Sequence, residues 1–115
     1  MDNQTFEQIK KATREVEIAL VNGDYISVDS SARKSRLTGE EIKNAIDKYG
    51  GKLSLSPEST YNNIYTIEIE NSNPKAWAVD LDLWTNGKLS DLTAQLTVVA
   101  EERGFIGLID DIHVL

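Results

Sequence analysis

The sequence predicts an α+β fold in which two N-terminal helices pack on one face of a four-stranded antiparallel meander sheet. Three observations indicate this class. Apolar residues recur at helical spacing in the first half of the chain, apolar and polar residues alternate with period two in the second half, and short turns separate the alternating runs. Because an antiparallel sheet usually buries one face, the apolar stripes of the helices would cover that face.

Length and composition are those of one small folded domain over residues 1–115. The chain is 40% hydrophobic and 27% charged, and it has no cysteine, which excludes disulfides and thiolate metal sites. The N-terminus lacks the basic start and apolar run of a signal peptide, and no apolar stretch is long enough to cross a bilayer. We therefore expect a cytoplasmic protein that makes no membrane contact.

The formal net charge of −7 is concentrated in the second half of the chain. Residues 1–63 hold 9 Lys/Arg and 10 Asp/Glu, whereas residues 64–115 hold 3 and 9, so the two parts carry −1 and −6. A strand-rich surface of this charge repels nucleic acid and attracts cationic partners. The charge leaves open the alternative that the acidic surface serves solubility alone.

The first helix is expected over residues 5–21. Its apolar residues are three or four positions apart and form one stripe: Phe6, Ile9, Thr13, Val16 and Leu20. Thr5 and Gln8 have the spacing of a capping box, and Asn22-Gly23 would end the helix.

The second helix begins at a clearer capping box, formed by Thr38 and Glu41, and ends at Gly50-Gly51. Between the helices, residues 25–29 predict a short strand and residues 30–36 an exposed basic loop. After the second helix, residues 52–55 predict another short strand and residues 57–62 a loop.

Four longer strands follow, over residues 64–70, 76–85, 88–98 and 105–115. In the first, Tyr65, Ile67 and Ile69 occupy one face. In the second, Trp77, Val79, Leu81 and Leu83 form the buried face, opposite Ala78, Asp80, Asp82 and Trp84.

Two tight turns set the expected registers. Asn86-Gly87 is typical of a two-residue turn, which pairs Thr85 with Lys88 and Leu81 with Leu92. It also sets Asp82 opposite Asp91, an unfavourable pair that splayed strands or a cation would relieve.

A three-residue turn at 102–104 would close the last hairpin. It pairs Val98 with Leu108, Ala94 with Ile112 and Gln95 with Asp111. Asp110 then points inward, which indicates a β-bulge or a hydrogen-bonded buried carboxylate.

The wet face of this sheet is the candidate partner-binding surface. No Lys or Arg falls at the outward positions of its strands, and an aromatic residue amid charge suits a protein interface. Trp84 would be the anchor, unless its ring merely folds over the sheet edge. The expected members are Glu68, Glu70, Asp80, Asp82, Trp84, Asp91, Asp111 and His113.

We expect no metal, no cofactor and no catalysis. The carboxylates and His113 lack the spacing of a known metal motif. Asp80 and Asp82 are neighbours on one face, but a pair of catalytic acids needs a concave site that pushes their pKa values apart, and an open sheet face offers none. No Ser or Cys motif accompanies His113.

Several segments together resemble a family of small uncharacterised bacterial proteins. They carry a V-D-x-D-L-W-T strand, here residues 79–85, an S-D-L-T segment at 90–93 and a D-D-[IL]-H-V-L ending at 110–115. The similarity spans residues 38–115 and implies no established activity. Small acidic single-domain proteins of this kind also resemble, in type, the immunity proteins of bacterial toxin systems, including contact-dependent growth inhibition.

These observations favour an immunity protein that binds and neutralises a cognate, nuclease-type toxin through its acidic surface. Nuclease toxins hold phosphate in basic clefts, which an acidic sheet face can occupy with fast, steered association. One alternative is a small-ligand-binding or enzyme-like domain with a pocket near Tyr25, Tyr49 and Trp77. Another is an oligomerisation module that pairs through its sheet edge.

Overall fold

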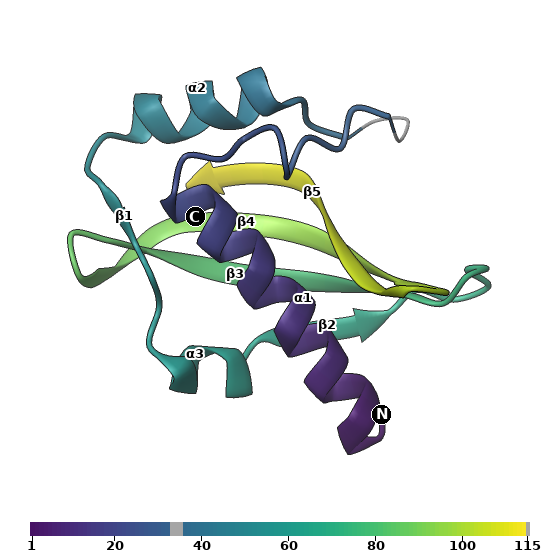
Figure 1. Ribbon diagram of the computed structural model, residues 1–115. Helices are drawn as coiled ribbons and strands as arrows, with labels where there is room; N and C mark the ends of the chain where they lie inside the picture. The colour runs from purple at the N-terminus through teal and green to yellow at the C-terminus, as the bar shows by residue number, and fades with distance from the viewer. Residues whose placement is uncertain (33–35, 115) are drawn as a thin grey trace.

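The computed structural model describes residues 1–32 and 36–114 and has an α+β architecture (Figure 1). Its elements are, in order, α1 (Asn3–Val21), α2 (Gly39–Tyr49), β1 (Leu53–Ser54), α3 (Glu58–Asn62), β2 (Tyr65–Glu68), β3 (Ala76–Thr85), β4 (Lys88–Glu101) and β5 (Gly104–Val114). One antiparallel sheet has the order β1-β3-β4-β5, and β2 pairs with β3 on the edge that β1 also uses. The expected fold class is therefore present, with a fifth strand and a third helix.

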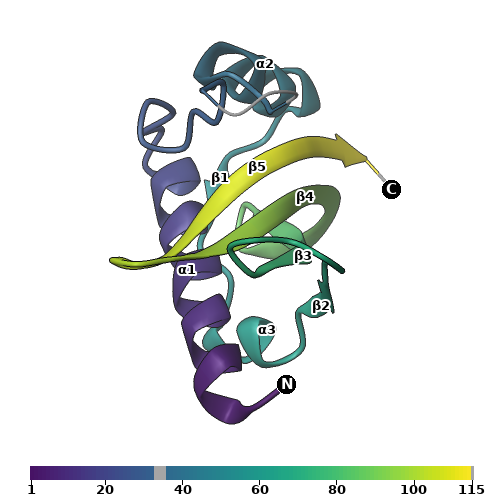
Figure 2. The same cartoon turned by 90° about the vertical axis from the view of Figure 1, so that its right-hand side faces the viewer.

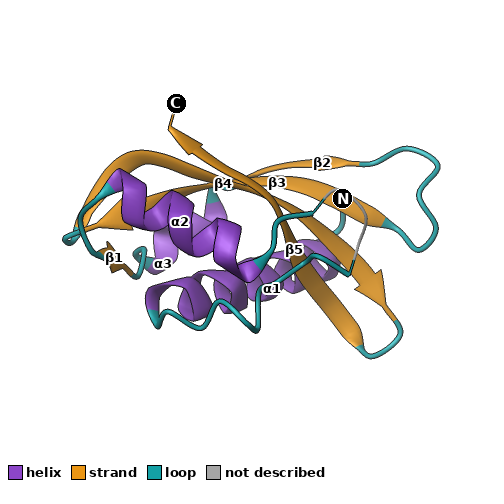
Figure 3. Cartoon of the chain, turned by 90° about the horizontal axis from the view of Figure 1, so that it is seen from above, coloured by secondary structure: helices purple, strands orange, loops and turns teal. Residues whose placement is uncertain are grey.

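Two layers result, because α1 and α2 lie on the same side of the sheet (Figure 3). We call the covered side the inner face and the opposite side, which none of the described helices covers, the outer face (Figure 2). The core lies between the layers, where the apolar stripe of α1 meets the inward residues of β3, β4 and β5, including Val79, Leu81, Leu96 and Ile109. None of the described helices combines the length and the apolar surface that crossing a membrane requires.

Both long helices begin at side-chain caps. In α2, Thr38 accepts from the Glu41 N–H at 3.1 Å and Glu41 accepts from the Thr38 N–H at 3.0 Å, so the expected capping box is confirmed. The cap expected at Thr5 is wrong. Asp2 caps α1 instead, because its carboxylate accepts from the Thr5 N–H at 2.7 Å, and this hydrogen bond lowers the pKa of Asp2.

The connection from α1 to α2 differs from the expected strand at 25–29. The Asp24 carboxylate accepts hydrogen bonds from both the N–H and the hydroxyl of Ser27, and these bonds bend the chain into turns. Further on, Ser30 is buried rather than exposed and accepts from the Ile109 N–H of β5 at 3.0 Å. Residues 33–35 of the expected basic loop lie outside the described residues.

A short helix, α3, stands where the sequence predicts a loop at 57–62. Its anchor is Glu17 of α1, whose buried carboxylate accepts from the N–H and hydroxyl of Ser56, at 3.1 and 2.5 Å, and from the Tyr61 hydroxyl. Three donors thus compensate for burying this charged side chain and fix α3 against α1.

The β3–β4 hairpin begins as expected and then shifts. Thr85 pairs with Lys88 across the Asn86-Gly87 turn, but an irregularity beyond Trp84 moves the register, so that Leu81 pairs with Ala94 rather than Leu92. Because the shift amounts to two residues, every side chain keeps its face. Asp82 faces Thr93 instead of Asp91, which removes the unfavourable carboxylate pair.

The β4–β5 hairpin turns through two residues rather than three. Val98 therefore pairs with Gly107 and not with Leu108. A bulge then shifts the register by one residue, after which Ala94 pairs with Ile112 and Gln95 with Asp111, as expected. Asp110 is the extra residue, so of the two expected explanations the bulge is confirmed.

Candidate protein-binding face

Alternation along β3 places three candidate residues on the outer face. Asp80, Asp82 and Trp84 alternate with the buried Leu81 and Leu83. Asp82 accepts from the Thr93 hydroxyl at 3.0 Å, whereas Asp80 makes no hydrogen bond or ion pair with any described residue. The two carboxylates are therefore available to a cation.

Asp111 and His113 lie on the same face, on β5. They pair with Gln95 and Thr93 of β4, which in turn pair with Asp80 and Asp82 of β3. His113 Nδ1 is 3.1 Å from Asp111 Oδ2, an ion pair when the imidazole is protonated. Five of the eight expected residues thus share one face: Asp80, Asp82, Trp84, Asp111 and His113.

The remaining three lie elsewhere, which corrects the expected surface. Glu68 pairs with Trp77 and therefore lies on the inner side of the sheet. It is exposed there because β2 is a short edge strand that packs mainly against β3. Glu70 lies in the turn after β2. Asp91 accepts from the Tyr49 hydroxyl of α2 at 2.5 Å, a bond that raises the pKa of Tyr49, so this carboxylate is turned toward the helix layer.

One cation reaches the outer face from outside the strands. Arg36, in the loop before α2, forms an ion pair with Asp110 and donates to the Thr97 hydroxyl at 3.1 Å. Thr97 also donates to Asp110 at 2.7 Å. Neither alternation nor spacing points to this contact, because it joins a loop to a strand far along the chain. The acidic face is thus neutralised at Asp110 but not at Asp80.

The outer face also has an apolar part, which lies on the side of β2 opposite to Glu68, the residue expected to point outward. Tyr65 pairs with Asp80 and Ile67 with Ala78, which puts the apolar residues of β2 outward, 63% and 50% exposed. A residue directly opposite the outward Asp80 must also point outward, but no tight turn joins β2 to β3, so the sequence carries no signal for this pairing. Exposed apolar residues beside charge are typical of protein interfaces.

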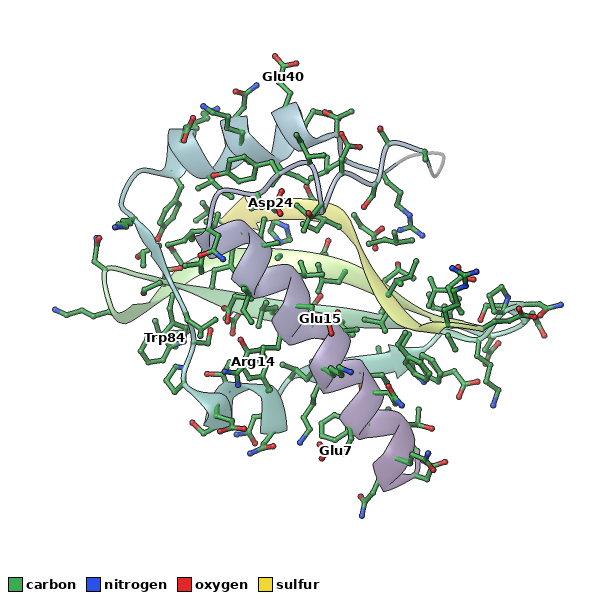
Figure 4. The ribbon with its side chains drawn as sticks, in the orientation of Figure 1. Glu7, Arg14, Glu15, Asp24, Glu40 and Trp84 are labelled. Carbon is green, nitrogen blue, oxygen red and sulfur yellow. The ribbon has the colours of Figure 1, made fainter. Side chains whose placement is uncertain are left out.

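A groove lies at the edge of this face. It measures about 370 Å³ and lies between the end of α3, the start of β2 and the outward residues of β3 and β4. We call it the edge groove, and its main lining residues are Ile64, Tyr65, Asp80, Asp82, Trp84 and Leu89. Trp84 stands near the connection between β1 and α3 (Figure 4). Its indole N–H is buried and has no acceptor among the described residues.

A family model described as a domain of unknown function, DUF7668, matches residues 18–115. The chain belongs to the DUF7668 family. No curated protein and no solved structure matches it. The range that defines DUF7668 in this chain contains the whole sheet and the edge groove, but only the last residues of α1.

Of the residues around the pocket considered as an alternative, near Tyr25, Tyr49 and Trp77, Tyr49 lines a cavity of about 550 Å³ between α2 and the ends of β4 and β5, whereas Trp77 does not. Trp77 is 4% exposed, stacks on Phe105 at 5.4 Å and pairs with Val98. Tyr49 bonds to Asp91 of β4. Asp91 lies seven residues before Val98, the partner of Trp77, so the two strand positions are about 20 Å apart. The two rings therefore cannot line one small cavity. Among the described residues, no group of three acidic or histidine side chains is placed to hold a metal ion.

Proposed function

We propose that this protein is a cytoplasmic binding protein whose outer face engages a basic protein partner. In its most concrete form, it is an immunity protein that neutralises a cognate nuclease toxin, as in contact-dependent growth inhibition. One observation carries the proposal: Asp80, Asp82 and Asp111 lie exposed on a face that none of the described helices covers, beside the exposed Tyr65. Carboxylates around an aromatic and apolar centre form the usual arrangement of a protein-binding surface.

The charge of the face favours a basic partner over nucleic acid. Phosphate backbones are repelled by carboxylates, whereas the phosphate-binding cleft of a nuclease is attracted to them. A carboxylate surface of this kind raises the association rate through electrostatic steering and discriminates against acidic partners.

The test uses the protein encoded by the neighbouring reading frame, if it ends in a basic domain. We expect the DUF7668 chain to bind the basic domain of its neighbour and to inhibit the nuclease activity of that domain. The double charge reversal Asp80→Lys with Asp82→Lys should weaken binding at least 100-fold, measured by calorimetry at fixed salt, because it puts cations opposite a cationic cleft.

A matched control changes the net charge equally on the other layer. Glu15→Lys with Glu40→Lys alters two exposed residues of α1 and α2 (Figure 4) and should change the affinity less than threefold. Equal losses in the two double variants would mean that only net charge matters, and the outer face would then not be the interface.

A further inference from the structure

The edge groove exists because one edge of β3 is only partly paired. β1 pairs with Trp84 and Thr85, β2 pairs with residues 77–80, and no described strand pairs with residues 81–83 on this edge. The end of α3 lies beside the gap and contributes to the groove wall. A partner side chain can therefore enter from the edge and the outer face together.

The lining combines negative charge with aromatic surface. Asp80 and Asp82 are two residues apart on one strand face, so their Cα atoms are about 7 Å apart. Asp80 is unpaired, Asp82 has one carboxylate oxygen bonded to Thr93, and no Lys or Arg of the described residues lines the groove. Tyr65 and Trp84 supply the rings.

Trp84 adds a second, independent observation. Its indole N–H is buried and has no acceptor among the described residues, and native proteins rarely leave such a donor unpaired. No hydrogen bond to a described residue therefore fixes the orientation of the indole ring.

We propose that the edge groove binds an arginine side chain of the basic partner, an inference that rests on the proposed function and specifies its contact. The guanidinium group is planar, so it can stack on Trp84 or Tyr65 while its N–H groups fork onto the carboxylates. A lysine ammonium is a strongly hydrated point charge and cannot make both contacts with one plane. A volume of about 370 Å³ accommodates the long arginine stem beside Leu89.

The experiment titrates the intact protein with acetyl-Gly-Arg-Gly-amide and follows the tryptophan indole N–H resonances by NMR. The chain has two tryptophans, and Trp77, buried on the inner face, is the internal control. We expect a saturable shift of the Trp84 resonance and an unchanged Trp77 resonance. The same peptide with neutral citrulline should bind at least tenfold more weakly, and the lysine peptide at least threefold more weakly.

Two variants locate the contact. Asp80→Asn with Asp82→Asn should abolish the saturable shift, whereas Glu15→Gln with Glu40→Gln, which neutralises two exposed carboxylates of α1 and α2 outside the groove, should preserve it. Peptide binding that is equal for arginine, lysine and citrulline, or that is lost equally in both variants, would overturn the inference. Partner binding that depends on Asp80 and Asp82 would then still support the proposed function. Arginine-selective peptide binding, together with a failure to bind the neighbouring basic domain, would support the arginine contact and contradict the proposed function.

Discussion

Tyr61 and Glu17 show how a single interior contact links stability to protonation. The Tyr61 hydroxyl donates to the buried Glu17 carboxylate, and the Arg14 guanidinium lies 5.7 Å from the centre of the Tyr61 ring. Burial, and then the contact with Glu17, raise the pKa of Tyr61 above its ordinary value of 10.0, because both disfavour a phenolate. The neutral tyrosine is therefore favoured in the folded state more strongly than in the unfolded chain.

This difference predicts a pH-dependent stability above pH 10. The stabilising contribution is fully present below the unfolded pKa of 10.0 and is lost as pH rises toward the folded pKa, because the unfolded chain releases this proton first. Between pH 10.5 and 11.5, the free energy of unfolding should fall more steeply in the wild type than in Tyr61→Phe, by up to about 1.4 kcal/mol per pH unit. Urea unfolding of both proteins measures this, and parallel slopes would contradict it.

At the scale of elements, the sequence predicts best where a local signal determines the structure. The capping box starts α2, and Asn86-Gly87 sets the first pair of the β3–β4 hairpin. The helix α3 has no such signal, because five residues show no periodicity and its N-terminus has no side-chain cap. The expected strand at 25–29 fails because Asp24 supplies competing hydrogen bonds.

The candidate face is predictable only where a local pattern determines it. Asp80, Asp82 and Trp84 follow from alternation, which survives a register shift of two residues. Tyr65 does not follow, since a long connection joins β2 to β3 and no tight turn determines which face of β2 points outward. Arg36 is also missed, because a contact between a loop and a distant strand leaves no pattern in the sequence.

Gly107 offers a test of the packing between α1 and β5. A Cβ atom added there would lie 2.6 Å from Val16 Cγ2, closer than real contacts permit. Gly107→Ala should therefore lower the free energy of unfolding by about 1–3 kcal/mol through overpacking. The cost should be smaller by at least about 1 kcal/mol in a Val16→Ala background, measured as the coupling energy of a double-mutant cycle. Additive effects would show that this contact is not the cause.

Across the whole molecule, the sheet separates a helix side on which cations and carboxylates are interspersed from an outer face with few cations among the described residues. The helix α1 carries three cations and three carboxylates, whereas the outward positions of β3 and β5 carry carboxylates that only Arg36, among the described residues, is shown to neutralise. Cations are thus interspersed with the carboxylates of α1 and α2 but nearly absent from the outer face among the described residues, and under the proposed function that face would orient a basic partner before contact. Carboxylates held together on one face cost stability through repulsion between their charges.

This cost predicts how salt changes stability. Asp80→Asn with Asp82→Asn should raise the free energy of unfolding by about 0.5 kcal/mol at 10 mM NaCl, because it removes repulsion on the outer face, and the gain should vanish at 500 mM as screening increases. Asp47→Asn on α2 is the control with the opposite sign, since Asp47 pairs with Lys43 at 2.7 Å and its loss removes an attraction. Urea unfolding at the two salt concentrations measures both. If the outer-face variant is no more stable than the wild type at low salt, the carboxylates do not repel one another, and the face is less negative than its composition suggests.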